Sequence, residues 1–294
     1  RLPSGWERVD YPAGNWKRLP PRYVRAMATQ ASTIGDHLRD WRRRRRMSQL
    51  DLALDAEISA RHLSFVETGR ARPSREMVLT LAGRLGLPLR EQNAMLLAAG
   101  YAPAFSAHGF ASDALAAARQ AVEHILKAQE PFPAIAVDRH WTLVAANGAI
   151  GPLLAGAAPY LLEPPVNVLR LAMHPEGLAP RILNRAAWSG HLLTRLQRDA
   201  FATGDPVLAD LWRELADYAP EAENHDTAGI FLPLMLRGDD GRTLSFISTI
   251  TNFGTPADVT LAELSLETFF PADAETRAAL ESTSLRHPGE GRGP

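Results

Sequence analysis

The stretch Ser48–Gly69, SQLDLALDAEISARHLSFVETG, predicts two short helices joined by a tight corner. Ser48 can cap the first helix, because its hydroxyl can accept a hydrogen bond from a backbone N–H group that has no partner within the helix. The residues Leu50, Ala53 and Leu54 follow at helical spacing. We therefore expect them to form the apolar face of this helix.

The second helix of this stretch has the dimensions of a DNA-reading element. Ser59 can cap it, and Leu63 and Val66 are its inward positions. Gly69 marks its end. Small polar and cationic side chains occupy the outer face, which suits the major groove of B-DNA. Capped helical pairs also occur in helical proteins that do not bind DNA, so the pattern alone leaves both interpretations open.

The residues of this region resemble the helix-turn-helix of the Cro and phage-repressor type. The resemblance covers roughly residues 33 to 97. It implies an all-α domain of five helices, similar to the DNA-binding domain of lambda repressor. The residues that match at the family's spacing are Ser48-Gln49, Leu52-Ala53, Ile58-Ser59, Leu63-Ser64, Glu67, Gly69 and Pro73-Ser74.

The resemblance also implies roles for individual residues. Gln49 would touch the phosphate backbone or an adjacent base, and Arg42 and Glu67 would form a buried ion pair. The groove-facing positions would be Ala60, Arg61, Ser64 and Phe65. The complete predicted DNA-binding set is Gln49, Ser59, Ala60, Arg61, Ser64, Phe65, Arg43 and Arg70.

Charge is distributed unevenly along the chain, although the net charge is only -1. Residues 30–104 contain 12 Arg and 8 Asp or Glu, a balance of +4, and they include the run Arg42–Arg46. Residues 105–294 contain 14 Lys or Arg and 23 acids, a balance of -9. We expect some of Arg43–Arg46 to reach DNA phosphate. A basic domain joined to an acidic one fits a DNA reader that carries a partner domain of another kind.

Several classes of protein lack support in the sequence. The chain has no Cys, which excludes disulfides, thiolate metal sites and cysteine nucleophiles. It has no P-loop, zinc-protease or serine-hydrolase motif, so we predict that it is not an enzyme and requires no cofactor or metal. A cluster of Glu221, Glu223, His225 and Asp226 lies in a polar loop, which we interpret as solvated rather than metal-binding. Without a long apolar stretch or a signal peptide, we expect a cytoplasmic protein.

The expected domain organisation has four parts. Residues 1–29 lack periodicity, and we interpret them as disordered or as a non-native extension of a chain that starts at Met27. Residues 30–104 form the helix-turn-helix domain, residues 105–280 form the second domain, and residues 281–294 form a disordered tail.

The second domain is predicted to combine helices with an antiparallel sheet. An amphipathic helix over residues 112–129 precedes a hairpin of strands at 133–137 and 141–145. Two amphipathic helices come next, and strands return at 230–237 and 242–253. The segment 259–270 is ambiguous between strand and helix. Strands, a helical insert and strands again indicate an α+β domain with about five strands.

This order resembles a PAS-type sensor, and longer motifs resemble the ligand-binding domain of MmyB-like transcription regulators. The resemblance covers about residues 105 to 273. It implies a PAS-like domain that holds a long apolar molecule such as a fatty acid. The motifs that carry it are VDRHWTLVAAN, NVLRLAMHP, the helix around Trp188, LSFISTITNFGTPADVTLAEL and ETFFPAD.

Large apolar residues of this domain are the candidates for a ligand pocket, and an arginine or histidine at its mouth could meet a carboxylate. The pocket candidates are Phe132, Val137, Trp141, Leu153, Leu169, Trp188, His191, Leu192, Trp212, Phe231, Leu234, Phe246 and Ile250. The candidates for the carboxylate are Arg170, Arg181, Arg185, His191 and Arg195.

We therefore predict a transcription regulator that binds operator DNA as a homodimer and senses a small apolar ligand. The helix that begins near Ser112 is expected to transmit the ligand signal to the DNA-binding domain. Two alternatives remain open at this stage. The second domain could dock another protein, or it could bind haem through His174 or His191.

Overall fold

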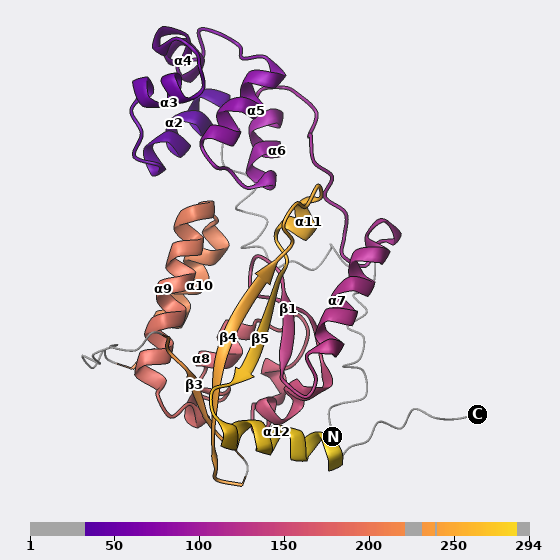
Figure 1. Ribbon diagram of the computed structural model, residues 1–294. Helices are drawn as coiled ribbons and strands as arrows, with labels where there is room; N and C mark the ends of the chain where they lie inside the picture. Colours follow the sequence, from indigo (N-terminus) through magenta and orange to yellow (C-terminus); the bar gives the residue numbers. More distant parts are fainter. Residues whose placement is uncertain (1–32, 221–230, 239, 287–294) are drawn as a thin grey trace.

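The computed structural model describes residues 33–220, 231–238 and 240–286 (Figure 1). The expectations for residues 1–29, for the acidic loop 221–226 and for the last residues of the chain lie outside this part. The described N-terminal domain is all-α, as the sequence predicts. Its helices are α2 (Ile34–Arg44), α3 (Gln49–Asp55), α4 (Ala60–Glu67), α5 (Arg75–Arg84) and α6 (Leu89–Ala98).

Local capping explains why these helices begin where they do. Thr33, Ser48, Ser59 and Ser74 stand immediately before α2, α3, α4 and α5, and each side chain accepts a hydrogen bond from a backbone N–H of its helix. Gly69 follows α4 with a φ of 73°, a conformation that glycine adopts without strain. The boundaries are therefore fixed largely by nearby residues.

The core of the N-terminal domain differs from the prediction at α3. Leu52 and Ala53 are buried, whereas Leu50 and Leu54 are 57% and 68% exposed. At 100° per residue, the core-facing side of α3 passes through Leu52, Ala53 and Ala56, which leaves Leu50 and Leu54 on the outside. The prediction of an apolar face is therefore confirmed for Ala53 and wrong for Leu50 and Leu54.

The C-terminal domain is an α+β fold around one antiparallel sheet, with strand order β2-β1-β5-β4-β3. This arrangement is PAS-like, as predicted. The ambiguous segment resolves into a short helix followed by a strand, and the last helix extends past the predicted domain end at residue 280. The strands are β1 (Ala134–Val137), β2 (Leu143–Ala146), β3 (Leu234–Arg237), β4 (Thr243–Asn252) and β5 (Ser265–Pro271). The helices are α7 (Ala116–Ala128), α8 (Val168–Met173), α9 (Arg185–Thr203), α10 (Pro206–Ala216), α11 (Val259–Ala262) and α12 (Ala274–Arg286), with short 3-10 turns at Asp113–Leu115, Gly148–Leu154, Pro159–Leu161 and Ala179–Arg181.

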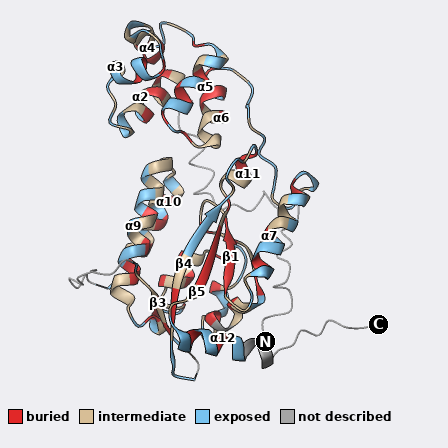
Figure 2. Cartoon of the chain, viewed as in Figure 1, coloured by how far each residue is buried: buried red, intermediate tan, exposed pale blue. Residues whose placement is uncertain are grey.

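The two faces of the sheet have different coverings. On one face, Val122 and Leu126 of α7 pack with Ala134 and Ala136 of β1. On the other face, α8, α9 and α10, called the helical layer below, cover a larger apolar core. Figure 2 shows β1 and β5 as buried strands between these layers, whereas the end of β4 near α11 is exposed. The apolar stripe of α7 is therefore used within its own domain.

Candidate functional site

Helix α4 presents the candidate DNA-binding surface. Arg61 is exposed, and its guanidinium carbon lies 5.3 Å from the centre of the half-buried Phe65 ring. Ser59 caps the helix, while Ser64 is half-buried. Ala60 packs partly against the domain core, so its methyl group is less available than the groove-facing prediction requires. Arg61 is the side chain of α4 that can reach furthest toward a base.

Arg42, Glu67 and Gln49 meet beneath this surface. Arg42 donates from Nε to Glu67 Oε1 at 2.6 Å and from Nη2 to Glu67 Oε2 at 2.9 Å. Gln49 Nε2 donates to the same carboxylate at 2.7 Å. Burial opposes ionisation, but these hydrogen bonds hold the pKa of the Glu67 carboxyl below its ordinary value. The carboxylate therefore fixes the position of Gln49, the predicted phosphate contact.

The network of Arg42, Glu67 and Gln49 lies where the backbones of α2 and α4 approach each other closely. A Cβ on Gly35 of α2 would lie 2.5 Å from the backbone oxygen of Glu67, at the end of α4. Real Cβ atoms do not approach a carbonyl oxygen so closely, and only glycine therefore allows α2 to lie against α4 at this point.

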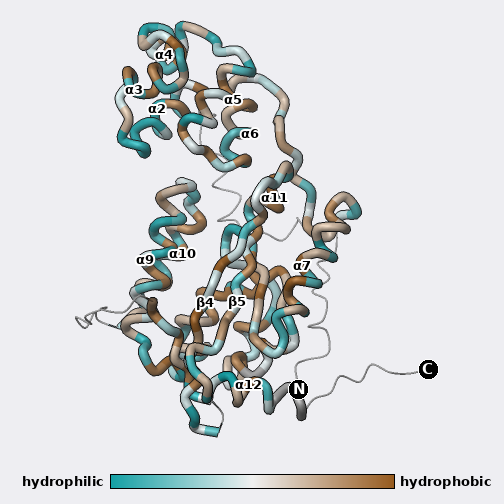
Figure 3. The backbone as a smooth tube through the Cα atoms, in the orientation of Figure 1, coloured by the Kyte–Doolittle hydropathy of each residue, from teal (hydrophilic) through white to brown (hydrophobic). Residues whose placement is uncertain are grey.

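The arginine run at the end of α2 divides between two directions. Arg43, Arg46 and the more distant Arg70 are exposed and free to meet phosphate. Arg45 instead donates to the carbonyl oxygen of Leu85 at 2.8 Å, and its Nη2 lies 3.5 Å from the carbonyl oxygen of Ala202 in the C-terminal domain. The end of α2 is hydrophilic in Figure 3, yet part of that charge serves a contact within the chain.

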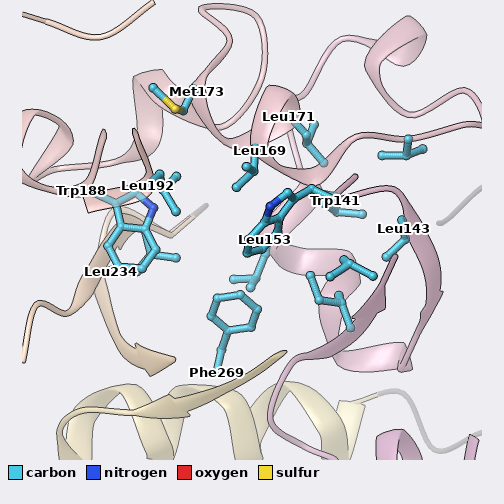
Figure 4. Close-up of a cluster of buried hydrophobic side chains, with 14 of the residues drawn as sticks. Trp141, Leu143, Leu153, Leu169, Leu171, Met173, Trp188, Leu192, Leu234 and Phe269 are labelled. Atoms are coloured by element: carbon cyan, nitrogen blue, oxygen red, sulfur yellow. The ribbon is translucent and has the colours of Figure 1, made fainter. Parts of the chain in front are cut away.

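An apolar cavity of about 90 Å³ lies between the sheet and the helical layer of the C-terminal domain. Predicted ligand residues come together in its wall, and Figure 4 shows Leu153, Leu169, Trp188, Leu192 and Leu234 around it. The other lining residues are Ile135, Leu143, Ile150, Leu154, Val168, Leu171, Ala172, Leu178, Leu236, Glu267 and Phe269, none of which was among the predicted ligand residues.

The remaining ligand candidates lie elsewhere. Val137, Trp141 and Phe246 are buried in the surrounding core, and Trp212 packs against it. Phe132 packs against the same core without lining the cavity, and its ring is tilted against that of Phe270, with ring centres 6.1 Å apart. Two further candidates are at the surface: Phe231 is 54% exposed, and Ile250, on the exposed half of β4, is 37% exposed.

The candidate arginines have different partners. Arg170 forms an ion pair with Glu214, Arg181 donates to the carbonyl oxygens of Leu153 and Ala155, and Arg185 donates to that of Tyr218. Arg195 lies over the Trp141 ring, 4.1 Å from its centre, and its Nη1 is 3.8 Å from Glu267 Oε1. Among these arginines, Arg195 is therefore the one that lies beside the charged residue of the cavity wall, Glu267.

The two candidate histidines do not line the cavity. His174 accepts a hydrogen bond from the backbone of Glu176 at 3.0 Å, and its ring lies between those of Tyr160 and Tyr218. His191 is exposed and stacks on Trp188, with ring centres 5.5 Å apart. In the part of the chain that the structure describes, no group of His, Cys, Asp and Glu residues could hold a metal ion. Among the helices described, none combines the length and the hydropathy of a membrane span.

Charged side chains join the two domains. Arg90 on α6 donates twice to the carboxylate of Glu263, which follows α11, at 2.7 Å each. Arg139 lies 3.2 Å from Asp205 and 3.8 Å from Glu263. His140 lies 2.8 Å from Asp205, the residue that caps α10. The turn between α9 and α10 is thus tied both to the β1–β2 turn and, through Glu263, to the N-terminal domain.

The segment that links the two domains is fixed by hydrogen bonds to a side chain of α6. Asn93 of α6 donates from Nδ2 to the carbonyl oxygen of Phe105 at 2.8 Å. Its Oδ1 accepts from the backbone N–H groups of Ala104 and Phe105 at 2.9 and 3.1 Å. One buried amide therefore fixes the direction in which the chain leaves the N-terminal domain.

Comparisons with known proteins agree with this architecture. Residues 33–95 match the model of a helix-turn-helix domain, and residues 118–282 match that of the MmyB-like transcription regulator ligand binding domain. No curated protein matches the chain. A solved structure, "Structure of an RNA-binding Light-Oxygen-Voltage Receptor", is 15% identical, covering 92% of this chain and 69% of that one, but its TM-score of 0.27 is too low to carry an argument. The family predicted from the sequence motifs is confirmed, and the chain belongs to the MmyB-like transcription regulators, with a helix-turn-helix domain ahead of a ligand-binding domain.

Proposed function

We propose that the C-terminal domain binds an apolar, fatty-acid-like molecule and thereby changes how the N-terminal domain binds its operator. The observation that carries this proposal is the position of α9. Near its start, Trp188 and Leu192 line the cavity, and near its end Ala202 lies against Arg45 of the N-terminal domain. A ligand that displaces one end of this helix changes the contact at the other.

The size of the cavity supports such a displacement. An apolar cavity of roughly 150 Å³ is known to take up benzene, and this one measures about 90 Å³. An acyl chain therefore fits only if the helical layer moves away from the sheet. A ligand that requires the wider arrangement binds the two arrangements with different affinity, which is the condition for shifting their equilibrium.

Helix α9 is better placed to transmit the signal than the helix at residues 112–129. Most of that segment is α7, whose apolar stripe packs on its own sheet. The described contacts between the two domains instead involve the α9–α10 turn, α11 and the linker segment. We therefore revise the expected route and assign the coupling to α9.

We further propose that the protein acts on DNA as a homodimer. One α4 helix covers a single half-site, and two such helices related by a two-fold axis would enter successive major grooves about 34 Å apart. Arg61 would read a base, while Gln49, Arg43 and Arg70 would contact phosphate. Since phosphate contacts supply much of the affinity, operator binding should weaken steeply as salt increases.

The first test is native mass spectrometry of the purified protein, followed by extraction of any released molecule. A dimer that releases an acyl compound supports the proposed ligand class. The released compound is then titrated into a complex of the protein with operator DNA, and affinity is followed by fluorescence anisotropy. An operator affinity that stays the same at saturating ligand removes the proposed coupling. A protein that carries nothing would favour a C-terminal domain that docks another protein.

A further inference from the structure

One charged residue lies in the otherwise apolar wall of the cavity. Among the described lining residues, Glu267 is the charged one. It stands on β5 between Ile135 of β1 and Ile250 of β4 and is only 6% exposed. Burying a carboxylate in apolar surroundings is costly unless the charge is paired. The acid at this position therefore calls for a chemical explanation beyond packing.

The partners of Glu267 leave it incompletely paired. Arg195 Nη1 lies 3.8 Å from Oε1, longer than a hydrogen bond, and the Ser248 hydroxyl adds one neutral contact. Burial raises the pKa of the Glu267 carboxyl, and Arg195 opposes this only in part. Burial also lowers the pKa of Arg195, which is 19% exposed at its side chain.

The surroundings of this pair contain few other charges. The neighbouring strands β1 and β4 place Ile135, Ser248 and Ile250 beside Glu267. On α9, the charged neighbours are Arg198 and Asp199, which both act on Arg195, and the titratable His191 interacts with Arg195 as well. In the described part of the chain, Arg195 is the charged group that acts on Glu267. The protonation of Glu267 is therefore governed by the apolar cavity, by Arg195 and by any ligand that occupies the space beside them.

These observations define which head group an apolar ligand can place in the cavity. A carboxylate would meet the negative charge of Glu267, and the low dielectric of the cavity makes that repulsion strong. The repulsion disappears if one proton is shared between the two carboxyl groups, because the protonated one then donates to the other while Arg195 balances the remaining negative charge. An alcohol needs no added proton, since its own O–H can donate to Glu267.

We propose, resting on the proposed ligand-sensing function, that Glu267 and Arg195 form a head-group subsite for an apolar chain that ends in a carboxylic acid or an alcohol. An acid binds there with the uptake of one proton, because the ligand is ionised in water while the complex holds a proton between ligand and Glu267. The free carboxylate, the ionised Glu267 and one proton from solvent thus give a complex with one negative charge beside Arg195.

The test uses octanoate and 1-octanol as matched probes of the full-length protein. Isothermal titration calorimetry from pH 7 to 9 gives the dissociation constant of each. We expect octanoate to lose affinity about tenfold per pH unit wherever free Glu267 is ionised, because one proton is taken up on binding. Titration in buffers with different heats of ionisation should count one proton per octanoate. Octanol should show a much smaller dependence on pH.

The decisive variant is Glu267→Gln, which keeps the shape of the side chain and supplies an N–H donor that needs no proton. It should bind octanoate at pH 9 more tightly than the unchanged protein does, with no proton uptake. This gain of affinity cannot result from misfolding. Glu123→Gln, the same change at an exposed site on α7, should bind like the unchanged protein.

Two results would overturn the proposal, and they differ in what else they affect. If octanoate binds and its pH dependence is the same in Glu267→Gln, the subsite assignment is wrong while the proposed sensing of an apolar ligand stands. If neither octanoate nor octanol binds at any pH tested, the subsite and the proposed ligand class fail together.

Discussion

Replacing Glu67 by alanine should destabilise the N-terminal domain without unfolding the C-terminal domain. Glu67 is 3% exposed, and its carboxylate accepts hydrogen bonds from Arg42 and Gln49. The Arg42 side chain is only 11% exposed and would retain its bond to the Met47 carbonyl oxygen, at 2.9 Å, but no counter-charge. Breaking a buried pair from one side costs about 3 kcal/mol or somewhat more, because the remaining charge is left uncompensated.

Native-state hydrogen exchange, read by mass spectrometry on peptides from α2 and α4, measures this loss within the full chain. About 3 kcal/mol corresponds to exchange that is roughly a hundredfold faster. The double variant Arg42→Met with Glu67→Leu should recover most of the protection, since apolar residues of similar volume can replace a buried ion pair. Asp55→Ala, which removes an exposed acid from α3, should change exchange little. If hydrogen exchange in Glu67→Ala is accelerated less than fivefold, which corresponds to about 1 kcal/mol, the reasoning is refuted.

Other variants test the remaining assignments. Arg61→Ala should weaken operator binding by about 1 to 3 kcal/mol and relax one base position, and an unchanged sequence preference in a panel of operators would remove Arg61 from the readers. Hydrogen bonds to the Glu67 carboxylate lower its pKa in the folded protein. The stability that they provide is therefore present above the pKa of the unfolded state, about 4.3, and is lost as pH falls below it. Urea midpoints of the N-terminal domain should show this loss in the unchanged protein and not in Glu67→Gln. Glu263→Gln should shrink the effect of ligand on operator affinity, whereas Glu281→Gln, an exposed change on α12, should not. Ala172→Phe should fill the cavity, because Ala172 lies in its wall, and calorimetry should then detect no octanoate binding. Operator binding without ligand should stay within about twofold, since α8, which carries Ala172, lies far from α4.

The N-terminal helices were predictable because their signals are local. A serine or threonine cap stands before α2, α3, α4 and α5, and the spacing of apolar residues does the rest. The face of α3 was harder to predict, because Leu50, Leu52 and Leu54 fit more than one helical stripe. Only packing against the other helices decides that Leu52 is the buried one. The direction of Arg45 depends in the same way on a contact with Ala202, far away in the sequence.

The cavity was only partly predictable. Large residues on the helical layer were natural candidates, and Leu153, Leu169, Trp188, Leu192 and Leu234 do lie in its wall. Most of the other wall residues are large and apolar too, such as Leu143, Ile150 and Leu236, so residue size alone does not distinguish the wall from the surrounding core. Glu267 was missed because a charged residue in a strand is usually assigned to the solvent face. Alternation along β5 did carry the signal, since Glu267 and Phe269 occupy the same face.

The ties between the two domains limit how this protein can be recombined. A chimera that joins its sensor to the DNA-binding domain of another regulator would retain Glu263 and the α9–α10 turn but lose Arg45, Arg90 and Asn93. Such a fusion would bind DNA and ligand independently of each other. Grafting these three side chains onto equivalent positions of the incoming domain is therefore the minimum requirement for a hybrid that still responds to its ligand.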